Sequence, residues 1–194
     1  MILVLFNQIA AAQGISSDRS ELDRLLAGIA AGEQSALAAL YQRTRGAVYG
    51  LSLSYLKEPQ DAQDVVQDTF VRIWDKAPDY VSQGSPMAWI LTIARNLSRM
   101  KLRERSRLTD LDEEQWSAIP AEAPRVTPED RELLQNALSA LGEEERRIVL
   151  LHAVTGLRHR EIADLVELPL STVLSKYHRA LKKLKAQLKG DEQP

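Results

Sequence analysis

The sequence contains no cysteine, which excludes disulfide cross-links, thiolate zinc sites and a cysteine nucleophile. Its 3 histidines, His152, His159 and His178, are not accompanied by carboxylates at metal-ligand spacing. We therefore expect no metal site and no cofactor. We also expect no catalytic residues, since the chain offers neither a nucleophile paired with a base nor a glycine loop for phosphate.

Long apolar runs are missing as well, and a membrane-spanning helix needs about 20 such residues. The apolar start of the chain, residues 1–14, is shorter, and no Lys or Arg precedes it as one would in a signal peptide. We expect residues 1–19 to form an N-terminal extension without membrane insertion, and the protein to be cytoplasmic.

Aromatic residues make up only 5% of the chain, while Ala, Leu, Glu, Lys and Arg are abundant. These residues favour helices because their side chains lose little rotamer freedom there. The alternation typical of strands is absent, and apolar residues recur at helical spacing. Asp61 and Ser171 are predicted to be the N-caps of two of the helices. We predict an all-α protein with helices over about 22–29, 35–55, 61–74, 87–105, 129–141, 143–155, 159–166 and 171–189.

The helical pattern is interrupted once, over residues 108–130. This stretch holds 7 acidic residues, 3 prolines and 1 arginine, and it shows no periodicity. It predicts a flexible acidic linker over 108–128. The linker would join two small helical domains, residues 20–107 and 129–190.

The net charge of −2 hides a strong segregation of charge. Residues 95–107 hold 6 Lys or Arg and 1 Glu. The predicted helix over 61–74 is acidic, and the predicted helix over 87–105 is basic. Two helices of opposite charge in one domain predict two different partners, one of them nucleic acid. Trp89, near the start of the basic helix, is interpreted either as a core anchor or as a contact for an unstacked base. The predicted helix over 61–74 begins an acidic, polar stripe that is made of Asp61, Asp64, Gln67, Asp68 and Asp75.

Residues 157–181 fit a helix-turn-helix, whose second helix lies in the major groove of DNA. Residues 176–189 hold 6 Lys or Arg and no acid, which suits contacts with phosphates. A solvated basic helix at the end of a bundle is the alternative interpretation. The residues expected to face inward are Ile162, Ala163, Leu165, Val173, Tyr177, Ala180 and Leu184.

Three strings together resemble a known family. DAQDVVQDTFVRIW and PMAWILTIARNLSRMKLR resemble region 2 of the sigma-70 family of RNA polymerase sigma factors. ALSALGEEERRIVLLHAVTGLRHREIADLVELPLSTVLSKYHRALKKLK is similar to its region 4. Their order and the short linker resemble the extracytoplasmic-function subfamily, which keeps only these two domains.

The resemblance implies an alternative sigma factor that binds core RNA polymerase and directs promoter-specific initiation. It implies a monomer when free, contacts with the β and β′ subunits, and control by an anti-sigma factor in a stress or envelope response. The residues that the resemblance assigns to polymerase binding are Asp61, Asp64, Gln67, Asp68 and Phe70.

The same resemblance implies two DNA contacts. The residues assigned to the −10 promoter element, as holders of a flipped base or as backbone contacts, are Asp79, Tyr80, Ser85, Trp89, Arg95, Asn96, Arg99, Lys101 and Arg103. The residues assigned to the −35 element are Arg158, Ser171, Thr172, Ser175, Lys176, Arg179 and Lys183.

Two other classes of protein are weighed against this one. A helix-turn-helix repressor or activator with a helical dimerisation domain explains residues 157–189 but leaves the charged helices of the first half unexplained. A helical enzyme or an anti-sigma-type interaction module is the other, and the enzyme lacks a nucleophile, a phosphate loop and a metal cluster.

Overall fold

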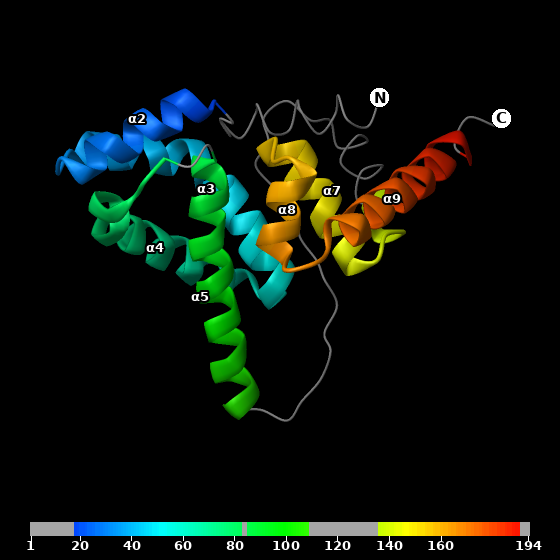
Figure 1. Cartoon of the computed structure of the whole chain (residues 1–194). Helices are drawn as coiled ribbons and strands as arrows, with labels where there is room; N and C mark the ends of the chain where they lie inside the picture. The colour runs from blue at the N-terminus through cyan, green and yellow to red at the C-terminus, as the bar shows by residue number, and fades with distance from the viewer. Residues whose placement is uncertain (1–17, 83–84, 109–135, 191–194) are drawn as a thin grey trace. The chain divides into compact units, whose positions relative to one another are not determined.

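The computed structural model describes residues 18–82, 85–108 and 136–190. These residues form helices joined by short turns and contain no strand, which confirms the predicted all-α class. They fall in two compact units, 18–108 and 136–190, each considered by itself (Figure 1). The predicted extension up to residue 17, the linker from residue 109 onward and the predicted helix over 129–135 lie outside the described residues.

The first unit is a bundle built around one long helix. This helix, α3 (Gln34–Leu56), packs against α2 (Arg19–Ala30), α4 (Pro59–Lys76) and α5 (Pro86–Leu108). A short 3₁₀ turn, η1 (Ala77–Asp79), follows α4 and packs on α2. Figure 1 shows α5 continuing past the helices it packs against. The core of this unit includes Leu22, Leu26, Leu40, Val48, Ile73, Ile90, Leu91 and Ala94, each fully buried.

The start of α4 differs from the prediction. Asp61 is not its N-cap: the helix begins two residues earlier, at Pro59, and Glu58 accepts the Gln60 N–H at 3.3 Å. A proline suits the first helical position because its missing N–H has no partner there anyway. Lys57, which ends α3, is left-handed with φ of 58°. The Asp61 carboxylate therefore lies within the first turn, where the helix dipole favours it.

The second unit holds α7 (Glu143–Thr155), α8 (His159–Val166) and α9 (Leu170–Gly190), preceded by a helical turn at 136–139. Its core confirms the predicted inward faces, since Ile162, Ala163, Leu165, Val173, Tyr177, Ala180 and Leu184 are all buried.

The predicted N-cap of the last helix is also wrong. Ser171 lies inside α9, and the Pro169 carbonyl instead accepts the N–H groups of Thr172 and Val173 at 2.9 and 3.1 Å. The turn before it is closed by Glu167, a left-handed residue with φ of 58°. Ser171 is the second residue of α9 and is exposed in its first turn.

Candidate functional site

The acidic face of α4 meets the basic helix α5 rather than standing apart from it. The Lys101 ammonium lies 2.7 Å from a carboxylate oxygen of Asp64 and 3.0 Å from one of Asp61. Arg105 lies 3.8 Å from Asp61. Partial burial lowers the pKa of Lys101, but its bonds to the two carboxylates outweigh that effect and raise the pKa. The acidic helix and the basic helix are therefore joined by ion pairs at this point.

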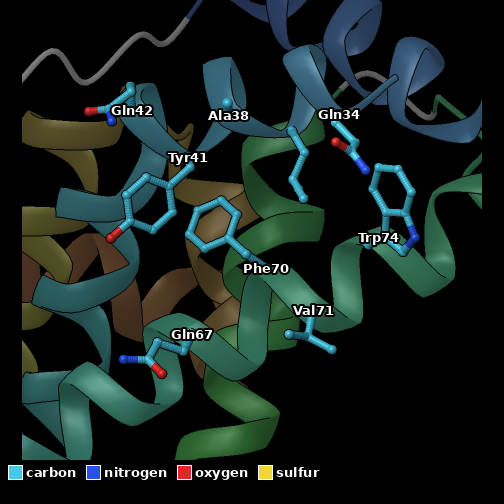
Figure 2. A pocket seen from close by; sticks show the side chains of 9 residues that line it. Gln34, Ala38, Tyr41, Gln42, Gln67, Phe70, Val71 and Trp74 are labelled. Atoms are coloured by element: carbon cyan, nitrogen blue, oxygen red, sulfur yellow. The ribbon is translucent and has the colours of Figure 1, made fainter. Parts of the chain in front are cut away.

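The other end of α4 borders an open groove against α3, with a volume of about 590 Å³. Figure 2 shows the rings of Tyr41 and Phe70 facing one another and Trp74 beside Gln34. The Tyr41 and Phe70 centroids are 4.8 Å apart, edge to face. Val71, which also lines this groove, is 64% exposed. The residues that line the groove are Gln34, Leu37, Ala38, Tyr41, Gln42, Gln67, Phe70, Val71 and Trp74.

The predicted polymerase-binding residues thus lie in three environments. Asp61 and Asp64 face α5 and are paired there. Gln67 and Phe70 line the groove, where Phe70 is only 6% exposed. Asp68 is exposed on α4.

The loop that follows α4 is tied to α2. The Tyr80 hydroxyl donates to one oxygen of Asp23 at 2.8 Å, and the Ser82 hydroxyl donates to the other at 3.0 Å. The Tyr80 ring is tilted against Trp89 with centroids 4.8 Å apart. Burial, and then the bond to Asp23, raises the pKa of Tyr80 to about 12, so its hydroxyl stays protonated. Trp89 is half-buried, which leaves both interpretations of this residue open.

The remaining −10 residues vary in exposure. Asp79 is exposed and lies 3.8 Å from Lys76, while Ser85 is half-buried. Along α5, Arg95 is only 8% exposed and donates two bonds to Asn96 Oδ1, at 3.2 and 3.0 Å. Arg99 is half-buried and Arg103 is exposed. The arginines of α5 thus become more exposed toward its C-terminal end, since Arg95 is covered by the bundle and Arg103 is not.

The outer face of α9 carries most of the predicted −35 residues. Ser171, Ser175 and Arg179 are exposed at helical spacing, and Thr172 and Lys176 are half-buried beside them. The Ser175 hydroxyl donates to the Ser171 carbonyl at 2.8 Å. The same face continues to Lys183, which is exposed. Arg158 is exposed at the N-cap of the neighbouring helix, α8. Its backbone N–H donates to the Glu161 carboxylate at 2.7 Å.

Two lysines of α9 are paired with glutamates of α7. Lys176 lies 2.7 Å from Glu144, and Lys183 lies 2.7 Å from Glu145. Glu145 is 8% exposed and also accepts the N–H of Gly142 at 3.3 Å. The bond to Lys183 is the main reason that the pKa of Glu145 is lowered. These pairs hold α9 against α7 and draw the two lysines toward the body of the unit.

A ring cluster lies where α7, α8 and α9 meet. His152 and His159 are stacked with centroids 4.5 Å apart, and Tyr177 contacts both rings edge-on. His152 Nδ1 lies 2.9 Å from the Leu157 carbonyl, whereas His159 Nε2 is buried without a hydrogen-bond partner. Burial, followed by the nearby imidazoles of His152 and His178, lowers the pKa of His159.

In the parts of the chain that the structure describes, no three His, Asp or Glu side chains are grouped in a way that would hold a metal ion. Within the same ranges, no helix combines the length and apolar character needed to cross a bilayer.

Several residues at these surfaces were not singled out from the sequence as site residues. Tyr41 and Trp74 belonged to helical apolar faces, and only packing leaves them at a groove. The acceptors Asp23, Glu144 and Glu145 carried no signal, since nothing in the local sequence names a partner on another helix.

Two family models match this chain. One, described as Sigma-70 region 2, covers residues 40–108, and the other, described as Sigma-70 region 4, covers residues 131–184. Together they span more than half of the sequence and contain α4, α5 and the helix-turn-helix.

Curated relatives carry the same family name. An ECF RNA polymerase sigma factor, SigK, of Mycolicibacterium vanbaalenii is 27% identical over 185 residues, covering 91% of this chain and 94% of that protein. SigK of Mycobacterium ulcerans is 29% identical, covering 85% of this chain and 92% of that protein.

Solved structures agree. CnrH in complex with the cytosolic domain of CnrY is matched with a TM-score of 0.57 and 27% identity, over 91% of this chain and 100% of that one. The sigma factor RpoE of Bartonella quintana, in complex with the anti-sigma factor NepR, is matched with a TM-score of 0.59 and 25% identity, over 77% and 94%. With both sigma-70 regions present in order and relatives matched along nearly their full length, the chain belongs to the extracytoplasmic-function group of RNA polymerase sigma factors.

Proposed function

We propose that the protein uses three surfaces of the described helices to direct core RNA polymerase to a particular set of promoters. Sigma factors are non-enzymatic initiation factors that bind RNA polymerase and promoter DNA. The main support for this proposal is the groove between α3 and α4, which is lined by Gln67, Phe70 and exposed Val71. An aromatic-lined groove rimmed by polar side chains suits a protein partner, because buried apolar anchors carry most binding energy.

The first surface would bind polymerase. Gln67, Asp68 and Phe70 would contact the clamp helices of the β′ subunit, with further contacts to β. Asp61 and Asp64 would contribute negative charge at its edge, although both are already engaged by Lys101. A basic partner surface would meet this acidic edge, which speeds encounter and fixes orientation.

Core binding tests this surface. Gln67→Arg places a cation at the groove, and we expect affinity for core polymerase to fall by about tenfold or more. Gln187→Arg, at an exposed position on α9, makes the same change far along the chain and should leave core binding unchanged. Replacing Asp64 by Arg is less informative, because it also breaks the bond to Lys101. Retained core affinity in Gln67→Arg would argue against the proposed surface.

The second surface would hold the melted −10 element. Tyr80 and Trp89 offer aromatic faces to an unstacked base, and Asp79, Ser85 and Asn96 offer polar groups beside them. The side chains toward the exposed end of α5 would follow the strand backbone: Arg99, Lys101 and Arg103, with buried Arg95 supporting them from within the bundle.

The third surface would read the −35 element. The outer face of α9 would enter the major groove, with Ser171, Thr172 and Ser175 near base edges. Arg158, Lys176, Arg179 and Lys183 would contact phosphates, which makes this binding salt-dependent.

We also propose that an anti-sigma factor controls the protein by covering these surfaces, as part of a stress or envelope response in the cytoplasm. One structural relative, RpoE, is seen with the anti-sigma factor NepR, and another, CnrH, is seen with the cytosolic domain of CnrY. The free protein would be a monomer.

Reconstitution tests the function as a whole. The purified chain should co-elute with core polymerase, and the mixture should start transcripts at defined sites. It should bind promoter DNA weakly alone and tightly as holoenzyme. Strong binding of a palindrome by a dimer without polymerase would favour a helix-turn-helix repressor instead.

A further inference from the structure

One carboxylate joins two segments that lie far apart in the sequence. Asp23, on α2, accepts hydroxyl bonds from Tyr80 and Ser82, 57 and 59 positions later. Each oxygen of the carboxylate takes one hydroxyl, at 2.8 and 3.0 Å. Two bonds on a single acceptor fix both the position and the direction of the segment that carries the donors.

The fixed segment leads directly to the aromatic pair. The Tyr80 ring, held through its hydroxyl, is tilted at 55° against Trp89 near the start of α5. Just before Tyr80 in the sequence, η1 packs against α2, and Ala77 is buried there. The conformation of residues 77–82 is therefore set by α2 together with the local 3₁₀ turn, in which the Tyr80 N–H donates to the Ala77 carbonyl at 3.1 Å.

We propose that Asp23 is a positioning residue for promoter recognition, which holds Tyr80 in the place where it and Trp89 receive the unstacked −10 base. This inference rests on the proposed function of the second surface. A loop held in its binding conformation loses less conformational entropy when DNA arrives, so the contacts it makes are worth more. Asp23 itself touches the loop and not the DNA.

A purely structural role would give a different pattern. If Asp23 only stabilised the bundle, its removal would lower the affinity for core polymerase, and it would lower binding to every promoter equally. If it acts by holding Tyr80, its removal should act at the −10 step alone. Its effect should also depend on whether the Tyr80 hydroxyl is present, because two residues that act through one bond are not additive.

The experiment compares holoenzymes formed with full-length variants. Asp23→Ala removes both acceptors, and we expect stable promoter complexes to fall about three- to tenfold, with core affinity unchanged. Asp23→Asn keeps an amide that can bond both hydroxyls and should restore most of this loss. Arg24→Ala makes the same helix-compatible change at the next, exposed position and should behave as wild type.

The double variant provides the decisive arm. Tyr80→Phe keeps the ring and removes the hydroxyl, and Asp23→Ala combined with Tyr80→Phe should be no worse than the more impaired single variant. Discrimination against a promoter with a substituted −10 base should shrink in Asp23→Ala. Additive losses, unchanged discrimination or an equal loss of core affinity would each overturn the inference.

The wild-type holoenzyme separates this inference from the proposed function. If wild type forms no promoter-specific complex, the proposed function fails and this inference fails with it. If wild type is active and Asp23→Ala is equally active, only the positioning role is refuted.

Discussion

The ammonium group of Lys101 lies 2.7 Å from the carboxylate of Asp64, which ties the helix that would follow DNA to the helix that would bind polymerase. Asp61 lies on the same ammonium at 3.0 Å, so one cation serves two carboxylates. Their side chains are 28%, 45% and 24% exposed for Lys101, Asp64 and Asp61, so the cluster is partly screened from solvent. A phosphate that recruited Lys101 would have to compete with both acids.

This cluster should contribute to the stability of the first unit. We predict that Lys101→Gln lowers the free energy of unfolding by about 0.5–1 kcal/mol, because it leaves two neighbouring carboxylates without their shared cation. The loss should shrink in high salt, which weakens the repulsion between the two acids. Urea unfolding followed by tryptophan fluorescence measures it, since Trp74 and Trp89 belong to this unit. Arg103→Gln, at an exposed position, is the control, and an equal loss there would contradict the prediction.

Lys176 should act at the −35 element. Lys176→Ala is predicted to weaken binding of the holoenzyme to −35 DNA and to reduce the salt slope of binding by about 1, as expected for one lost phosphate contact. Lys182→Ala changes an exposed lysine of the same helix that is not assigned to DNA. Filter binding over a salt series, on promoters with intact and substituted −35 elements, compares the two. An effect confined to promoters altered at −10 would refute groove docking by α9.

The second unit should lose stability as the solution becomes acidic. His159 has a lowered pKa because its ring is partly buried and lies beside His152 and His178. In the unfolded chain the imidazole of His159 takes up a proton at about pH 6.5, the ordinary value for histidine. In the folded chain the same imidazole is protonated only at lower pH. Stability is complete above about pH 6.5 and falls as pH decreases through and below that value.

Thermal unfolding between about pH 7.5 and about pH 5.5, followed by circular dichroism, measures this loss. His159→Phe should flatten the pH dependence, because the ring nitrogen it removes is buried and unbonded. His178→Gln, at an exposed position of α9, should retain most of it. A pH profile that is identical in wild type and His159→Phe would show that another group titrates.

Two glycines in helices should respond oppositely to alanine. A Cβ at Gly28 would lie 2.9 Å from the Ala36 Cβ, where α2 and α3 cross. A Cβ at Gly50 would meet nothing within 4 Å. We predict that Gly28→Ala destabilises the first unit by about 1–3 kcal/mol through overpacking, while Gly50→Ala stabilises it by about 0.5–1 kcal/mol through helix propensity. Urea unfolding of both variants checks the difference in sign, and stabilisation by Gly28→Ala would contradict the close crossing.

Local patterns were enough to predict the helices that the structure describes in full, and their buried faces. Val173, Tyr177, Ala180 and Leu184 recur at helical spacing, and all four are buried as predicted. The N-caps were predicted less well. Asp61 and Ser171 both carry suitable side chains, yet each helix begins before them. Pro59 is the first residue of α4, where a proline's missing N–H has no partner to lose, and Pro169 precedes α9 and accepts its first N–H bonds through its carbonyl.

The sequence by itself determined the helical class, the inward faces and the segregation of charge, because each depends on residues within a few turns of one another. Only the tertiary structure decided which charged side chains pair with one another inside a unit and which side chains hold residues 77–82. Lys101 meets Asp64, and Asp23 meets Tyr80, through the rotation and packing of whole helices. Such pairings depend on how the bundle buries its apolar faces, and no local spacing of residues specifies that.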